Sequence, residues 1–274
     1  MMIDRILSQA PVFLLVAARC FTTVLTLPLL SSRTVHRRVK LALSLYMAYF
    51  IFPQISLDFG TFARYSQFIS TDGSFTLEYV LLLLGEGLIG IILGFFVQII
   101  FGAFSTAGQF FAFQMGFSAS EVYDALSQVE NPLMGQFFNF VAMLIFLQNH
   151  WFQKLFLQGL VSSFSTLNAF SIVEHGDALL RFMLSSLSHL FLDALIIALP
   201  IMATLFLINV TMGILSKAVP QMNLLSEGFP ILILCTFLII FLLLPYLCSF
   251  FEQCFNYSFE NLGRLFINLK EKQI

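Results

Sequence analysis

The feature that most constrains this chain is an uncharged run of 34 residues, 87–120. The chain of 274 residues is 59% hydrophobic and only 10% charged, whereas soluble domains are about 25% charged. Four further uncharged stretches, most of them long enough for a membrane-spanning helix, cover residues 131–153, 155–173, 194–216 and 228–251. Alternating apolar and polar segments of about ten residues, typical of membrane β-barrels, are absent. The sequence therefore predicts an all-α integral membrane protein.

Hydropathy and turn-forming residues predict about six long, partly broken helical regions. They cover residues 6–30, 41–57, 79–113, 133–151, 189–215 and 230–251. Arg19 interrupts the first region, but no small-residue cleavage motif follows it, so we interpret this region as a retained helix and not as a signal peptide. The last two regions, joined by KAVPQMNLLSEGFP, are expected to form a second module shaped as a helical hairpin.

Length and charge both argue against a simple series of membrane crossings. As one helix, residues 87–120 would extend about 51 Å, whereas the hydrocarbon layer is about 30 Å thick. Non-helical backbone at membrane depth needs protein or water around it, so QFFAFQMGF, residues 109–117, is the expected bend, with Gly116 as its pivot. Six helices alternating from the basic cluster at 33–40 would place five basic residues on the cytoplasmic side and seven on the other, against the positive-inside rule. Either the helix number differs, or the helices do not cross in the ordinary way.

One face of the third region carries small and polar residues at intervals of four: Glu86, Gly90, Gly94, Gln98 and Gly102. The stretch GEGLIG within it matches a dinucleotide-binding fingerprint, but no acidic residue follows between Glu86 and Glu121, so we reject a cofactor. Gly90 and Gly94 form a GxxxG pair, which lets two helices approach closely. We interpret the five residues as a helix-packing seam.

Charges in or near membrane segments either mark a functional path or pair between helices, and both interpretations remain open for Arg19, Glu86 and Asp193. Zinc-protease and serine-hydrolase motifs are absent, and the four histidines lie on different segments. The four cysteines match no metal-binding pattern, and a pI near 6.1 gives no basic field for nucleic acid. We therefore expect no enzyme activity, no cofactor and no metal.

A group of apolar side chains, Phe110, Phe111, Phe113, Met115 and Phe117, immediately precedes the acidic segment SASEVYDALSQVE. Most phenylalanines in such a chain serve as core or lipid-facing bulk. This group differs because it lies between Gly108 and a polar loop. Aromatic and methionine side chains can seal a pore by excluding water and can still move aside. We therefore interpret the group as part of a gate.

Three stretches resemble the FliR family of type III export-gate proteins, which includes flagellar and virulence-injectisome branches. They are RCFTTVLTLPLLSSRTVHRRVKLALSL, GEGLIGIILGFFVQIIFGAFSTAGQFFAFQMGFS and ALPIMATLFLINVTMGILSKAVPQMNLLSEGFPI. In this order they cover the chain from about Arg19 to the C-terminal hairpin, and the GFPI sequence at 228–231 is closer to the flagellar branch. Two departures concern Asp124, which Ala125 follows where the family has proline, and Asn149, which stands where the family has glycine before histidine.

The resemblance implies a FliP-like portion at residues 1–185, with a plug loop at about 110–132, and a FliQ-like hairpin and tail at 186–274. It implies assembly with FliP and FliQ in the bacterial inner membrane at the flagellar basal body, with FlhB and FlhA on the cytoplasmic side. The expected plug residues are Phe110, Phe111, Phe113, Met115, Gly116, Phe117, Glu121 and Asp124. The residues of the turn between the last two helical regions are typical of an ordinary hairpin turn and equally of a subunit contact; the expected contact residues are Pro220, Gln221, Asn223, Gly228, Phe229 and Pro230.

The leading hypothesis is a non-enzymatic subunit of the flagellar export gate, through which unfolded proteins pass. One alternative is the equivalent subunit of a virulence injectisome. Another is a secondary transporter of a small solute, with a broken helix at 108–116 forming a site near the membrane midplane. An intramembrane enzyme would need a nucleophile with a positioned base.

Overall fold

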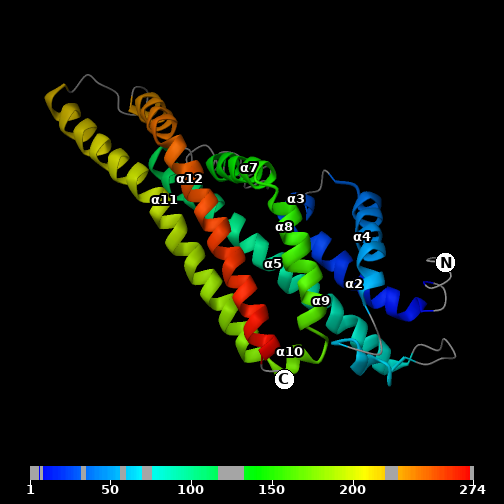
Figure 1. The fold of residues 1–274 in the computed structure, drawn as a ribbon. Helices are drawn as coiled ribbons and strands as arrows, with labels where there is room; N and C mark the ends of the chain where they lie inside the picture. Colours follow the sequence, from blue (N-terminus) through cyan, green and yellow to red (C-terminus); the bar gives the residue numbers. More distant parts are fainter. Residues whose placement is uncertain are drawn as a thin grey trace. The chain divides into compact units, whose positions relative to one another are not determined.

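The computed structural model describes residues 6, 9–31, 35–55, 60–69, 76–116, 133–219 and 228–271, and all regular structure in these ranges is helical. Figure 1 shows the helices in chain order. The elements are α2 (Ala10–Thr26), α3 (Pro28–Ser31), α4 (Arg37–Ile51), η1 (Phe52–Gln54), η2 (Ala63–Tyr65), α5 (Leu77–Gln114), α7 (Leu133–Gln148), α8 (Trp151–Lys154), the π-helical segment η3 (Leu155–Val161), α9 (Ser162–Thr166), α10 (Ser171–Glu174), α11 (Gly176–Ala218) and α12 (Phe229–Glu271). The all-α prediction is confirmed for the described part of the chain.

Local sequence explains where several helices begin and end. α2 ends at Thr26 because Pro28 forces the preceding residue, Leu27, into an extended conformation. The side chain of His36 accepts a hydrogen bond from the backbone N–H of Arg38 and so caps the start of α4. α7 and α8 are separated at His150, whose φ of 54° lies in the left-handed region that interrupts a helix.

Among the described residues, three helices are long and apolar enough to cross a membrane: α5, with 38 residues, and α11 and α12, with 43 residues each. The third region was expected to be helical over 79–113 and to bend within 109–117 at Gly116; α5 remains helical through Gln114, and the chain turns at Met115 and Gly116. α11 begins at Gly176, 13 residues before the predicted start, and α12 continues 20 residues past the predicted end at 251. Hydropathy identifies only the most apolar part of each helix. The predicted boundary between residues 185 and 186 falls inside α11.

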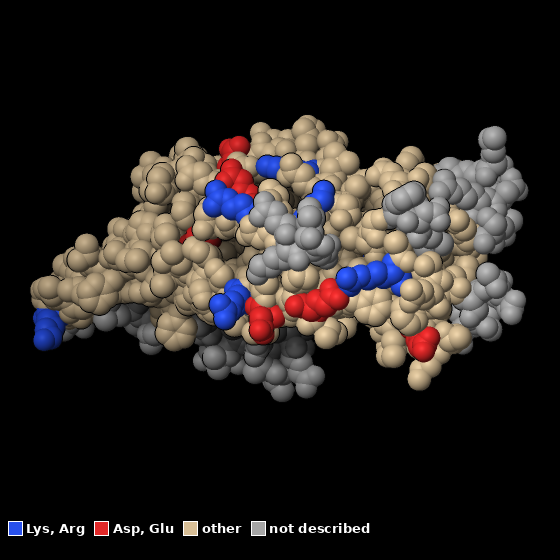
Figure 2. All heavy atoms as spheres, turned by 60° about the horizontal axis from the view of Figure 1, so that its bottom comes forward, with Lys and Arg blue, Asp and Glu red and all other residues tan. Residues whose placement is uncertain are grey.

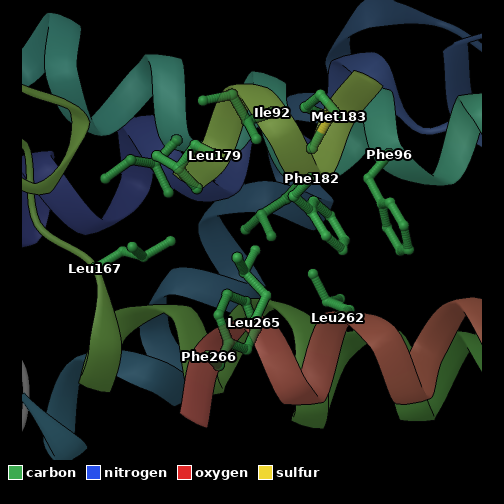
Figure 3. Close-up of a pocket in the computed structure, with 11 residues that line it drawn as sticks. Ile92, Phe96, Leu167, Leu179, Phe182, Met183, Leu262, Leu265 and Phe266 are labelled. Atoms are coloured by element: carbon green, nitrogen blue, oxygen red, sulfur yellow. The ribbon is translucent and has the colours of Figure 1, made fainter. Parts of the chain in front are cut away.

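The chain divides into two compact units: unit 1 comprises residues 1–99, 150–186 and 258–274, and unit 2 comprises 100–149 and 187–257. In unit 1, α2 packs on α4, and parts of α5, α11 and α12 share an apolar core. Figure 3 shows the side chains of Leu179 and Phe182 from α11 and of Leu262 from α12 converging on this core. The rings of Phe96 and Phe182 lie 5.2 Å apart within it. The parts of α11 and α12 that extend beyond their most apolar segments are therefore helical because they bury side chains in this core of unit 1.

Unit 2 is held together largely by aromatic rings. Phe104 of α5 stacks on Phe251 of α12 with ring centroids 4.2 Å apart. Phe255 contacts Phe101, Phe104 and Phe146 at 5.2 to 5.4 Å. Such pairs add about 0.5 to 1.5 kcal/mol each beyond the area that they bury. Part of the high phenylalanine content thus forms a dense core between α5, α7 and α12.

Candidate functional site

A buried ion pair joins α2 to α5 within unit 1. One guanidinium nitrogen of Arg19, Nη2, lies 2.7 Å from Oε2 of Glu86, and Nε of Arg19 donates a hydrogen bond of the same length to that oxygen. Neither side chain is exposed to solvent. A buried charge of this kind is tolerated only when it is paired and its other donors are satisfied. The sequence left open whether these two residues meet, and the structure brings them together.

The remaining donors of Arg19 reach the segment around α9. Nη1 donates to the hydroxyl of Ser163 at 3.1 Å, and Nη2 donates to the backbone carbonyl of Leu167 at 2.9 Å. The guanidinium carbon also lies 4.2 Å from the ring centroid of Phe164, which is a cation–π arrangement. Arg19 therefore fixes three parts of the chain, α2, α5 and the 163–167 segment, at a single point.

Tyr65 adds a fourth segment to this centre. Its hydroxyl donates a hydrogen bond to Oε1 of Glu86 and accepts one from the backbone N–H of Ala169. Burial raises the pKa of the Tyr65 hydroxyl above its ordinary value, and the nearby Glu86 carboxylate raises it further. The hydroxyl consequently keeps its proton and remains a donor. We call Arg19, Tyr65, Glu86 and Ser163 the polar centre.

At Gly90 and Gly94, which follow Glu86 along α5, the helices α2 and α5 approach so closely that only glycine fits on α5. A methyl group on Gly90 would overlap the carbonyl of Arg19 and the hydroxyl of Thr22, and one on Gly94 would overlap Thr26. The threonine hydroxyls donate to backbone carbonyls of their own helix, so their polar atoms are satisfied at this close contact. Close approach through small residues is the usual way in which helices pack in membranes.

The predicted seam does not face a single neighbour. Glu86, Gly90 and Gly94 are buried against unit 1 residues, whereas Gln98 is exposed. Gly102 is half-buried in unit 2, where a methyl group would lie 3.1 Å from Leu190 of α11. A four-residue interval exceeds one helical turn by about 40°, which is why the five positions spread around α5.

The predicted plug residues lie at the C-terminal end of α5, in unit 2. Phe111 is fully buried and packs on Phe138 of α7 at 5.3 Å, and Met115 is also fully buried. Phe113 is 74% exposed, and Phe110 is half-buried. The chain then turns at Gly116 with a φ of 81°, a conformation that L side chains rarely adopt. Phe117, Glu121 and Asp124 lie outside the described residues.

The predicted subunit-contact turn is described only at its end. Gly228 is buried, Phe229 is half-buried and Pro230 is exposed at the start of α12. The ring of Phe229 lies directly against Gly116, where any added methyl group would collide with it. Pro220, Gln221 and Asn223 lie outside the described residues. Within unit 2, the turn that ends α5 is therefore in contact with the first residue of α12.

Comparison with known proteins assigns this chain to a family. The model of the family described as "Bacterial export proteins, family 1" matches residues 10–258 of the chain. The chain belongs to this family, the FliR family. A flagellar biosynthetic protein FliR from Borreliella burgdorferi is 32% identical over 188 residues, covering 68% of this chain and 70% of the relative. The proteins of the same name from Bacillus subtilis and Escherichia coli are 28% and 29% identical, and cover 96% and 92% of the chain and 97% and 91% of their own length.

In this FliR-family chain, the sequence indicated Arg19 and Glu86 as charges of interest but missed their partners. Both lie in connectors between predicted helical regions, Tyr65 between 41–57 and 79–113 and Ser163 between 133–151 and 189–215. Both are fully buried, and neither has a charge that would distinguish it in an apolar sequence. The only available signal was the cost of burying Arg19, which requires several hydrogen-bond acceptors nearby.

Proposed function

We propose that this protein is a structural and gating subunit of the flagellar type III export gate. It assembles with FliP and FliQ in the bacterial inner membrane, contacts FlhB and FlhA on the cytoplasmic side, and catalyses no reaction. Unfolded flagellar proteins pass through the resulting pore, and the segment after α5 closes that pore between substrates.

The observation that carries the proposal is the family match over residues 10–258, together with relatives named flagellar biosynthetic protein FliR that cover more than nine tenths of the chain. The three long apolar helices agree with a place in a membrane. α11 and α12 also expose large apolar side chains, including Phe206, Leu207, Phe241 and Leu242, each at least 60% exposed. Such faces need lipid or neighbouring subunits to cover them.

The end of α5 supports the gating role. Phe111 and Met115 are anchored in unit 2, whereas Phe113, between them in sequence, is 74% exposed on the same helix end. α5 is followed by a turn at Gly116, whose φ is 81°. A helix end that presents one exposed aromatic ring beside buried ones is suited to a hydrophobic constriction, which gates by excluding water.

The transporter hypothesis places a broken helix at residues 108–116. α5 is helical through Gln114 and turns only at Met115 and Gly116, so most of this segment is regular helix and gives that hypothesis little support. The injectisome alternative predicts a different cargo for the same architecture. Complementation of motility in a strain that lacks its own flagellar subunit distinguishes the two, because an injectisome subunit does not restore flagellar export.

The gate is tested by deleting residues 118–131. We expect the variant to co-purify with FliP and FliQ as the intact protein does. We also expect it to raise the leakage of ions and small solutes across the inner membrane of cells that carry the complex. Deletion of residues 71–74 in another connector is the control and should leave permeability unchanged. An assembled complex with normal permeability after the first deletion would refute the gating role.

A further inference from the structure

Unit 1 contains an open groove that belongs neither to the polar centre nor to the end of α5. Its volume is about 630 Å³, and its walls are the α8 to α9 segment on one side and the C-terminal part of α12 on the other. Ile267, which is 59% exposed, provides apolar surface, while Lys154, Arg264 and Lys270 bring positive charge. Glu260 is the one acidic residue among the lining residues.

The groove has more positive charge than its surroundings neutralise. On the face drawn in Figure 2, basic and acidic side chains lie interspersed in a much larger neutral surface. The charge of Arg64, for example, is neutralised by Glu174, whose Oε1 lies 2.7 Å from Nη1 of Arg64. Among the described residues, by contrast, Arg264 and Lys270 are exposed and form no ion pair. The helix dipole accounts for Lys270 in the last turn of α12, but its effect does not extend to Arg264.

Hydroxyl groups in the same groove determine what else a ligand must offer. The hydroxyls of Ser162 and Ser165 donate to backbone carbonyls of their own segment. With those hydrogen bonds in place, their remaining lone pairs accept hydrogen bonds. A suitable ligand combines negative charge for the cations with N–H donors for these oxygens. A polypeptide with acidic side chains has both, whereas inorganic phosphate and phosphatidylglycerol have no N–H donor.

Distance along α12 argues against a lipid headgroup. The last uncharged stretch ends at Phe251, and Glu252 begins the charged part of the helix. Arg264 lies about 13 residues further along, or about 20 Å at 1.5 Å per residue. The headgroup layer on each side of a bilayer is only about 5 to 8 Å thick. If the apolar part of α12 crosses the membrane upright, Arg264 therefore lies beyond the headgroup layer.

We propose that this groove binds an extended acidic polypeptide segment of a partner protein. Carboxylates of the segment pair with Arg264, Lys270 and Lys154, its backbone N–H groups donate to the hydroxyls of Ser162 and Ser165, and its apolar side chains cover Ile267. Lys154 is positioned for this role, because its ammonium group already lies 5.8 Å from the centroid of the Phe259 ring at the groove wall. This proposal stands independently of the gating role.

The test uses the full chain in detergent and a fluorescein-labelled ten-residue peptide of alternating glutamate and serine, with binding followed by fluorescence anisotropy. A peptide of alternating glutamine and serine is the uncharged control. We expect the glutamate peptide to bind at least tenfold more tightly than the control. Arg264→Gln with Lys270→Gln should weaken its binding at least fivefold, whereas Arg37→Gln with Arg38→Gln, which removes the same charge from exposed positions on α4, should change it less than twofold.

A second variant keeps the test decisive if the groove double variant does not fold. Glu260→Gln removes the one carboxylate of the lining and should tighten binding of the glutamate peptide at least twofold. Equal effects of the two double variants, no binding of the glutamate peptide, or unchanged binding by Glu260→Gln would overturn the proposal. So would displacement of the peptide by short-chain phosphatidylglycerol or inorganic phosphate more effectively than by unlabelled peptide, because the groove would then be a phosphate site.

Discussion

Replacing Arg19 by leucine should destabilise the protein more than replacing Arg19 and Glu86 together. The single change leaves the Glu86 carboxylate buried without its cation, and removal of one partner of a buried pair costs about 3 to 5 kcal/mol. It also removes the hydrogen bonds from Arg19 to Ser163 and Leu167. In the double variant, Arg19→Leu with Glu86→Leu, no uncompensated charge remains. Its main cost is the lost acceptor of the Tyr65 hydroxyl, or about 1 to 3 kcal/mol.

Trp151, the single tryptophan of the chain, reports this unfolding directly. It is 4% exposed and lies in unit 1, the unit that contains the polar centre. Titration of detergent-solubilised protein with a denaturing detergent, followed by Trp151 emission, gives the free energy of unfolding of each variant. We expect the single variant to be less stable than the double variant by at least about 1 kcal/mol. Equal stabilities, or a double variant less stable than the single one, would refute the account of the polar centre as a charge pair that needs both members.

Two further predictions concern unit 1. Gly90→Ala places a methyl group against the Arg19 carbonyl and should lower the free energy of unfolding by about 1 to 3 kcal/mol. Gly263→Ala, in open space on the unit 1 part of α12, should be neutral or stabilising by up to about 1 kcal/mol; equal effects in the Trp151 assay would contradict the close packing. Tyr65→Phe should cost about 1 to 3 kcal/mol at neutral pH. Folding raises the pKa of the Tyr65 hydroxyl, so the contribution of this group to the free energy of unfolding is complete below its unfolded pKa of about 10 and is lost as pH rises further. The unmodified protein should therefore lose stability above pH 10 faster than Tyr65→Phe. Parallel pH profiles of the free energy of unfolding would contradict this.

The sequence predicts the apolar helices well because lipid imposes one simple requirement on them. Uncharged stretches at 87–120, 131–153 and 228–251 coincide with much of α5, α7 and α12. The helix limits were less accurate. α11 and α12 extend into unit 1 as amphipathic helices, and their burial there depends on contacts with α5 that no hydropathy average contains. Within the expected bend at 109–117, the turn falls at Met115 and Gly116, because Phe111 packs on α7 and holds the last turn of α5 in helical form.

The polar centre was predictable only in part. The cost of burying Arg19 and Glu86 indicates that each needs a partner, but 67 positions separate them in sequence, and 144 separate Arg19 from Ser163. Tyr65 had no signal of its own, because a tyrosine in a connector is usually an ordinary surface residue. Its role depends on the short helix η2, which places the hydroxyl between Glu86 and the backbone of Ala169.

The central claim is that the exposed ring at the end of α5 faces a passage walled by protein. The most direct measurement is photo-crosslinking from benzoylphenylalanine placed at Phe113 in the assembled export complex, with the products identified by mass spectrometry. The account predicts adducts to FliP, FliQ, the chain itself or an exported protein in transit. Adducts formed mainly with phospholipid acyl chains in the intact complex would contradict it.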